Sequence, residues 1–191
     1  YYNDEQWDTF ADVISDIDPS INVLHIPGNH DVIIGEGAVD SSPFTDRYGE
    51  DCFVLCERGV RLVGINSNLI KYDDPEEESQ YGWLTDVLNK EDEDEVTLVF
   101  SHHPFFLGEI DEEDGYFQIQ KSKRQRYFDL CKEKDVDALY AGHLHNNSSG
   151  DYSGIPVRTT TSVAFQIGDA QPSIRVITIT DGTISDRLLN L

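Results

Sequence analysis

The sequence is poor in several residue types, and each shortage argues against a class of protein. Its 191 residues include no methionine, so Tyr1 is not a translation start and further residues are expected upstream. Lys and Arg number 14 against 37 Asp and Glu, and the formal net charge is -23. A surface of that sign repels a phosphate backbone, which argues against nucleic acid as a partner. No apolar run is long enough to cross a bilayer, so no membrane span is expected.

Cysteine is also scarce, with three residues in the chain. Cys52 and Cys56 belong to one strand-like run, in which they lie about 13 Å apart, too far to form a disulfide. We therefore expect them and Cys131 to be unpaired and buried as small hydrophobic side chains. The lack of a disulfide pattern favours a reducing, cytoplasmic compartment.

The hydrophobic content is sufficient for one packed domain. Hydrophobic residues make up 38% of the sequence, and no internal repeat or long linker separates a second core. We therefore interpret residues 1–191 as a single domain.

Apolar spacing predicts helices and strands in alternation along the chain. Helices are predicted over 3–17, 79–89 and 122–134, the first capped by an Asn. Strands are predicted over 22–26, 52–55, 61–66, 96–100, 138–140, 157–161, 162–166, 174–180 and 183–188. Asp181-Gly182 predicts a two-residue hairpin turn between the last two strands. The acidic run over 91–95 is expected to be a solvated loop.

Three of the predicted strands lead into polar loops that contain histidine. The loops are Pro27-Gly28-Asn29-His30-Asp31, Ser101-His102-His103-Pro104 and Gly142-His143-Leu144-His145. Ligands of α/β proteins commonly bind at the edge of the sheet where strands end. Neutral imidazole and amide or carboxylate oxygens are suitable ligands for Zn, Mn or Fe. The pattern therefore indicates a metal site.

These three motifs stand in the order found in the calcineurin-like metallophosphoesterases, with Gln80-x-x-Trp83-Leu84 between the first and the second, as in many members. The chain resembles this family over nearly its whole length. It is most similar to the cytosolic calcineurin-like phosphoesterase-domain subfamily, through the acidic stretch 110–114 and the Gly142-His-x-His motif. The resemblance implies an α/β fold, an α-β-β-α sandwich of two mixed sheets flanked by helices. The first strands of that fold are expected upstream of Tyr1.

The resemblance also implies a dinuclear metal centre of two divalent ions, with Mn, Fe and Zn as candidates. Asn29, His102 and His143 would bind the second metal ion, and His145 would bind the first. Two further family motifs, Asp-x-His and Gly-Asp, are expected upstream of Tyr1, where they would supply the remaining ligands and the carboxylate that bridges the two ions. Residues 1–191 alone are therefore expected to bind at most one ion tightly and to show no appreciable activity.

His30 and Asp31 take catalytic roles by the same resemblance. His30 would contact the substrate phosphate and help to protonate the leaving oxygen. Asp31 would hold the other ring nitrogen of His30 and so keep the ring oriented.

The implied function is the hydrolysis of phosphate monoesters, including phosphoproteins, by a hydroxide that bridges the two metal ions. Two alternatives stay open. One is a phosphodiesterase of the same fold, because a fold does not determine the substrate. The other is a degenerate domain that binds metal or phosphate without hydrolysis.

Four other basic residues are candidates for structural roles. His25, inside a predicted strand, is expected to be structural. His103 is expected either to take part in the site or only to line its pocket. Arg124 and Arg126 could reach a phosphate, but their place in a predicted helix rich in Lys favours a solvated face.

Overall fold

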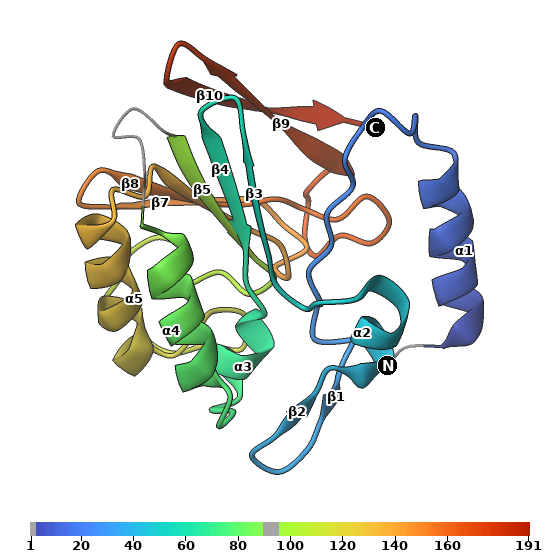
Figure 1. Ribbon diagram of the computed structural model, residues 1–191, viewed down its shortest axis with the longest axis horizontal. Helices are drawn as coiled ribbons and strands as arrows, with labels where there is room; N and C mark the ends of the chain where they lie inside the picture. Colours follow the sequence, from blue (N-terminus) through green and yellow to red (C-terminus); the bar gives the residue numbers. More distant parts are fainter. Residues whose placement is uncertain (1–2, 90–95) are drawn as a thin grey trace.

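The computed structural model describes residues 3–89 and 96–191, and the acidic run over 91–95 lies outside them. Figure 1 shows a central sheet with helices α4 and α5 against one face and the hairpin of β9 and β10 against the other. The predicted α/β class, with a mixed sheet flanked by helices, is confirmed. No helix of the described residues is long and apolar enough to span a membrane.

The central sheet has six strands in the order β3-β4-β5-β6-β8-β7. Strands β4, β5, β6 and β8 are parallel, and the two edge strands run antiparallel to their neighbours. The bounds are β3 Phe53–Glu57, β4 Val60–Gly64, β5 Val96–Ser101, β6 Ala138–Ala141, β7 Ser148–Tyr152 and β8 Ile155–Thr159. The carboxyl ends of β4, β5 and β6 therefore lie at the same edge of the sheet.

One face of the sheet packs against α4 (Glu77–Val87) and α5 (Lys121–Glu133). The largest buried cluster joins Val99 and Leu139 of the sheet to Leu84 of α4 and Phe128 of α5. The short helix α3 (Ser67–Lys71) follows β4 directly and is almost entirely buried. This packing fixes the edge of the sheet from which the site loops leave.

The hairpin β9 (Ser173–Thr180) and β10 (Thr183–Asn190) covers the opposite face. Ile177 and Ile179 of β9 pack against a buried cluster of β5 and β6 residues that includes Leu98. The predicted turn is confirmed, because Asp181 and Gly182 both have positive φ, at 49° and 74°, as a type I′ hairpin requires. Within the described residues this second β layer is an antiparallel pair rather than a mixed sheet, since only these two strands reach it.

The amino-terminal helix α1 spans Asp4–Ser15, and the side chain of Asn3 caps it by accepting from the backbone N–H of Gln6 at 2.8 Å. The helix packs on α2 (Ser42–Tyr48), where the ring centroids of Trp7 and Tyr48 lie 5.4 Å apart. The short strands β1 (Ile33–Ile34) and β2 (Val39–Asp40) pair as a separate hairpin.

Two predicted strands are wrong, over 22–26 and over 162–166. Both segments are extended or bent but have no strand partner among the described residues. Their apolar side chains are correspondingly exposed, with Leu24 at 40% and Val163 at 57%. An apolar run becomes a strand only where a neighbouring strand accepts its hydrogen bonds.

All three cysteines are free, as predicted, but they are not all buried. Cys131 is buried and Cys52 is half-buried, whereas Cys56 is exposed. Cys56 lies on the edge strand β3, on the side that alternation turns away from the core.

Candidate metal centre

Three loops meet at the carboxyl edge of the sheet. Ser101 at the end of β5 pairs with Ala141 at the end of β6, so the loops that follow start side by side. The backbone N–H of Gly142 donates to the carbonyl of His102 at 3.1 Å and joins these two loops. The third loop is held from α3, where the Asn68 side chain donates to the carbonyls of Pro27 and Gly28 at 3.3 Å.

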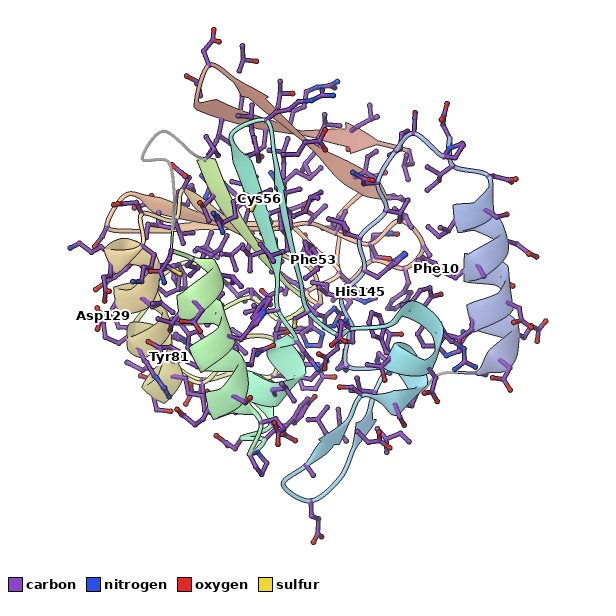
Figure 2. All side chains as sticks on the ribbon, in the orientation of Figure 1. Phe10, Phe53, Cys56, Tyr81, Asp129 and His145 are labelled. Atoms are coloured by element: carbon purple, nitrogen blue, oxygen red, sulfur yellow. The ribbon has the colours of Figure 1, made fainter. Side chains whose placement is uncertain are left out.

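The structure brings all six predicted site residues together. They line one cavity of about 280 Å³, which also has aromatic and aliphatic side chains in its wall. The six are Asn29, His30, Asp31, His102, His143 and His145; Figure 2 labels His145 among the side chains.

Three donor atoms in this cavity already converge. Nε2 of His102 lies 2.9 Å from Oδ1 of Asn29 and 3.0 Å from Nδ1 of His143. Ligand atoms about 2.1 Å from a metal ion and at right angles to one another lie about 3 Å apart. The spacing and the nitrogen and oxygen donors therefore fit one divalent cation bound by Asn29, His102 and His143.

The imidazoles have the charge state that metal binding needs. Burial, together with the neighbouring charge of His143, lowers the pKa of His102 to about 3. Burial likewise lowers the pKa of His143 to about 4. Both rings are therefore neutral near pH 7, with lone pairs available to a cation.

His145 stands apart from this convergent set but has the tautomer of a ligand. Its Nδ1 lies 2.6 Å from the backbone carbonyl of Phe165. A carbonyl can only accept, so Nδ1 carries the proton and Nε2 keeps its lone pair. His143 and His145 both have positive φ, at 61° and 51°. Such backbone conformations are uncommon outside glycine and often occur at functional sites.

The profile of the calcineurin-like phosphoesterase family matches residues 1–147, which contain all three motif loops. The chain belongs to this family. Members of the family use divalent metal ions. In this chain His102, His103 and His143 form a histidine group that can bind one.

Curated relatives of this phosphoesterase domain include serine/threonine-protein phosphatase CPPED1. The protein from Danio rerio is 30% identical, over 100% of this chain and 63% of its own length. The protein from Homo sapiens is 28% identical, over 98% of this chain and 62% of its own length. The chain therefore spans less than two thirds of the length of these relatives.

Among solved structures, a purple acid phosphatase, PPD1 from yellow lupin seeds, superimposes with a TM-score of 0.71 at 14% identity. The match covers 96% of this chain and 41% of the lupin chain. At that identity the likeness supports the fold alone.

His103 also lies in the histidine group, since its donor atoms fall within 4.8 Å of those of His102 and His143. Its hydrogen bonds nevertheless indicate a structural role in the phosphoesterase domain. The hydroxyl of Ser67 accepts the backbone N–H of His103 at 2.8 Å and lies 3.0 Å from its Nδ1. If the hydroxyl donates to Nδ1, the proton of the neutral ring lies on Nε2, which then has no lone pair for a cation.

His30 and Asp31 lie beside the donor set on the first loop. Oδ2 of Asp31 accepts from the backbone N–H of Gly28 at 2.8 Å and closes the turn. Burial raises the pKa of Asp31. Burial lowers the pKa of His30, whereas the charge of Asp31 acts in the opposite direction. The orientation of His30 by Asp31 stays a prediction.

The expectation for Arg124 is wrong, whereas Arg126 does lie on a solvated face. Arg124 is fully buried and donates to the carbonyls of Ile119, Ile110 and Glu112 at 2.9, 3.0 and 2.7 Å. It thereby secures the loop that precedes α5. Sequence reasoning missed this loop because its anchor is a charge that points inward.

That loop brings an aromatic residue to the centre that the sequence did not single out. The ring of Tyr116 lies 5.4 Å from the ring of His143, centroid to centroid. Phe117, the next residue, lies 5.7 Å from the same imidazole. The available signal was an aromatic pair directly after the acidic stretch 110–114.

Proposed function

We propose that this domain carries part of the active site of a two-metal phosphomonoesterase, and that phosphoproteins are among its substrates. Asn29, His102 and His143 hold one divalent ion, and His145 binds a second. The strongest support for this proposal is that Nε2 of His102 lies within 3.0 Å of both Oδ1 of Asn29 and Nδ1 of His143.

The side chains of this domain have different roles in the proposed reaction. Divalent ions, when bound, supply charge for the phosphoryl oxygens and lower the pKa of a bridging water. His102 and His143 remain neutral because they are buried, so they act as ligands rather than as proton donors. His30 is exposed in the cavity next to Asn29 and can reach the leaving oxygen to protonate it.

The comparisons with relatives support a monoester rather than a diester as the substrate of this domain. The CPPED1 proteins of Danio rerio and Mus musculus, both named serine/threonine-protein phosphatases, match 100% of this chain. Two relatives named as phosphodiesterases match 83% and 85% of it. The strongly negative net charge of -23 also disfavours polyanionic nucleic acid as a substrate.

Metal titration tests the ligand assignment directly. In calorimetry with Mn²⁺, Asn29→Ala, His102→Ala and His143→Ala should each weaken binding by about tenfold or more, because each removes a donor. His25→Ala is the matched control, since His25 lies outside the metal cavity and packs against Tyr48. Unchanged affinity in all three ligand variants would exclude this donor set. Residues 1–191 as a separate polypeptide should bind at most one ion tightly, because the described donors suffice for no more than one.

Turnover tests the proton donor and the degenerate alternative. In the natural protein, His30→Ala should lower turnover of a phosphoserine peptide by about 10² to 10⁴ while metal content stays unchanged. Serine is a poor leaving group, so an unchanged rate would rule out proton donation by His30. Tight metal binding without any hydrolysis by the natural protein would favour the degenerate domain instead.

A further inference from the structure

An exposed tyrosine marks the wall of the metal cavity. Tyr116 has 66% of its surface exposed, although its ring lies against the ring of the buried His143. The neighbouring Phe117 ring meets it edge-on, with centroids 5.2 Å apart. Large exposed aromatic rings often mark binding surfaces, because leaving them in water is unfavourable.

The loop that carries Tyr116 is held firmly at its start. The carboxylate of Glu112 accepts from the backbone N–H groups of Leu107, Gly108 and Glu109 at 2.8, 2.9 and 3.2 Å. The buried guanidinium of Arg124 holds the carbonyls that precede Tyr116, as described above. The acidic stretch thus turns one carboxylate inward as a support for the loop.

The same loop is held on both sides of Tyr116. Nζ of Lys71 donates to the carbonyl of Gly115 at 3.0 Å and to that of Gln118 at 2.5 Å. Ile119 is fully buried, and its N–H donates to the carbonyl of Pro104 at 2.9 Å. A loop without helix or strand that is anchored in this way presents Tyr116 in one place. Preorganisation of that kind lowers the entropic cost of binding a partner.

We propose that Tyr116 is a specificity-determining residue, against which an apolar or aromatic group next to the substrate phosphate packs. This inference rests on the proposed phosphomonoesterase function. His143 would place the phosphate through the metal, and the adjacent Tyr116 ring would then contact the residue flanking the phosphorylated one.

Two phosphoserine peptides provide the test, one with Phe and one with Gly on both sides of the phosphoserine. Their leaving group is the same, so any difference in kcat/KM reports on the flanking residues. Phosphonate analogues of both peptides give dissociation constants without turnover. The natural protein, loaded with Mn²⁺, should prefer the Phe peptide by about three- to tenfold, as one aromatic contact would provide.

In Tyr116→Ala the ratio between the Phe and Gly peptides should fall close to one, both in kcat/KM and in the dissociation constants of the phosphonates. Tyr116→Phe should keep the preference for the Phe peptide. Val13→Ala is the control, because Val13 is 60% exposed on α1 and lies outside the cavity. Phe165→Ala is the competing variant, since Phe165 is 64% exposed and lines the cavity beside His145. Loss of the preference in Phe165→Ala but not in Tyr116→Ala would overturn the assignment.

Binding and turnover separate this inference from the proposed function. Peptides that bind with a Tyr116-dependent preference but are not hydrolysed would support the inference and refute the function. Hydrolysis with equal kcat/KM for both peptides in the natural protein would refute the inference and support the function. Absence of both binding and hydrolysis would overturn both.

Discussion

Replacing Gly28 by alanine tests how closely the first loop approaches His102, a proposed metal ligand. A Cβ at this position would lie 2.9 Å from Cε1 and 3.0 Å from Nδ1 of His102, and 3.1 Å from Oδ2 of Asp31. Ordinary van der Waals contact begins near 3.4 Å. Relief of the closest contact therefore needs a shift of about 0.5 Å in the ring or in the loop.

That shift is large on the scale of metal coordination. Ligand distances in metal sites are held within about 0.2 Å. His102 Nε2 contacts both other donors at 2.9 and 3.0 Å, so moving its ring disturbs the whole set. We expect Gly28→Ala to weaken Mn²⁺ binding by about 10- to 100-fold, as does loss of other groups that orient ligands.

Gly142→Ala is the matched control for this experiment. Gly142 belongs to the motif loop that follows β6, but a Cβ there would meet only the carbonyl oxygen of His102, at 4.0 Å. Its effect on Mn²⁺ affinity should stay within about threefold. Calorimetric titration measures the affinities, and urea unfolding without metal should show a cost of about 1 to 3 kcal/mol for Gly28→Ala. Equal Mn²⁺ affinities in Gly28→Ala and wild type would refute the proposed donor geometry.

Two buried groups near the centre should matter more for folding than for metal binding. His103→Ala should cost about 2 to 4 kcal/mol in urea unfolding, through a cavity and the lost Ser67 contact, with Mn²⁺ affinity nearly unchanged; a loss of affinity as large as in His102→Ala would make His103 a ligand. Arg124→Leu should cost about 3 to 5 kcal/mol, because it leaves buried carbonyls without donors. Arg126→Leu removes only an exposed ion pair with a glutamate, so it should lower the free energy of unfolding by less than about 1 kcal/mol. Similar losses in both arginine variants would contradict a structural role for the buried Arg124.

The sequence was sufficient to predict which residues line one cavity, whereas their roles there stay predictions. Asn29, His102 and His143 stand in polar loops that follow apolar segments, and the donor chemistry resides in the residue types themselves. Parallel pairing of β5 and β6 then brings two of these loops together, as expected for strands that end at one edge. The cap at Asn3 and the turn at Asp181-Gly182 were equally predictable, because both depend on residues within a few positions.

Elements that are short or that depend on distant partners were not predictable. The hairpin of β1 and β2 has two residues in each strand, too few for a periodic pattern. The segment 22–26 has the composition of a strand, yet no described strand pairs with it. Strand formation requires a partner, and the segment's own sequence does not supply one.

The resemblance named His102 as a ligand and left His103 open, and the tertiary structure shows which hydrogen-bond partner each ring has. The two are adjacent in sequence, but His102 faces Asn29 and His143, whereas His103 faces the hydroxyl of Ser67. The tautomer of each ring depends on that partner, and Ser67 lies 36 positions away. In the same way, the inward turn of Arg124 depends on carbonyls of the preceding loop. Residue type determined which groups can bind a metal ion, and folding determined which of them lie together.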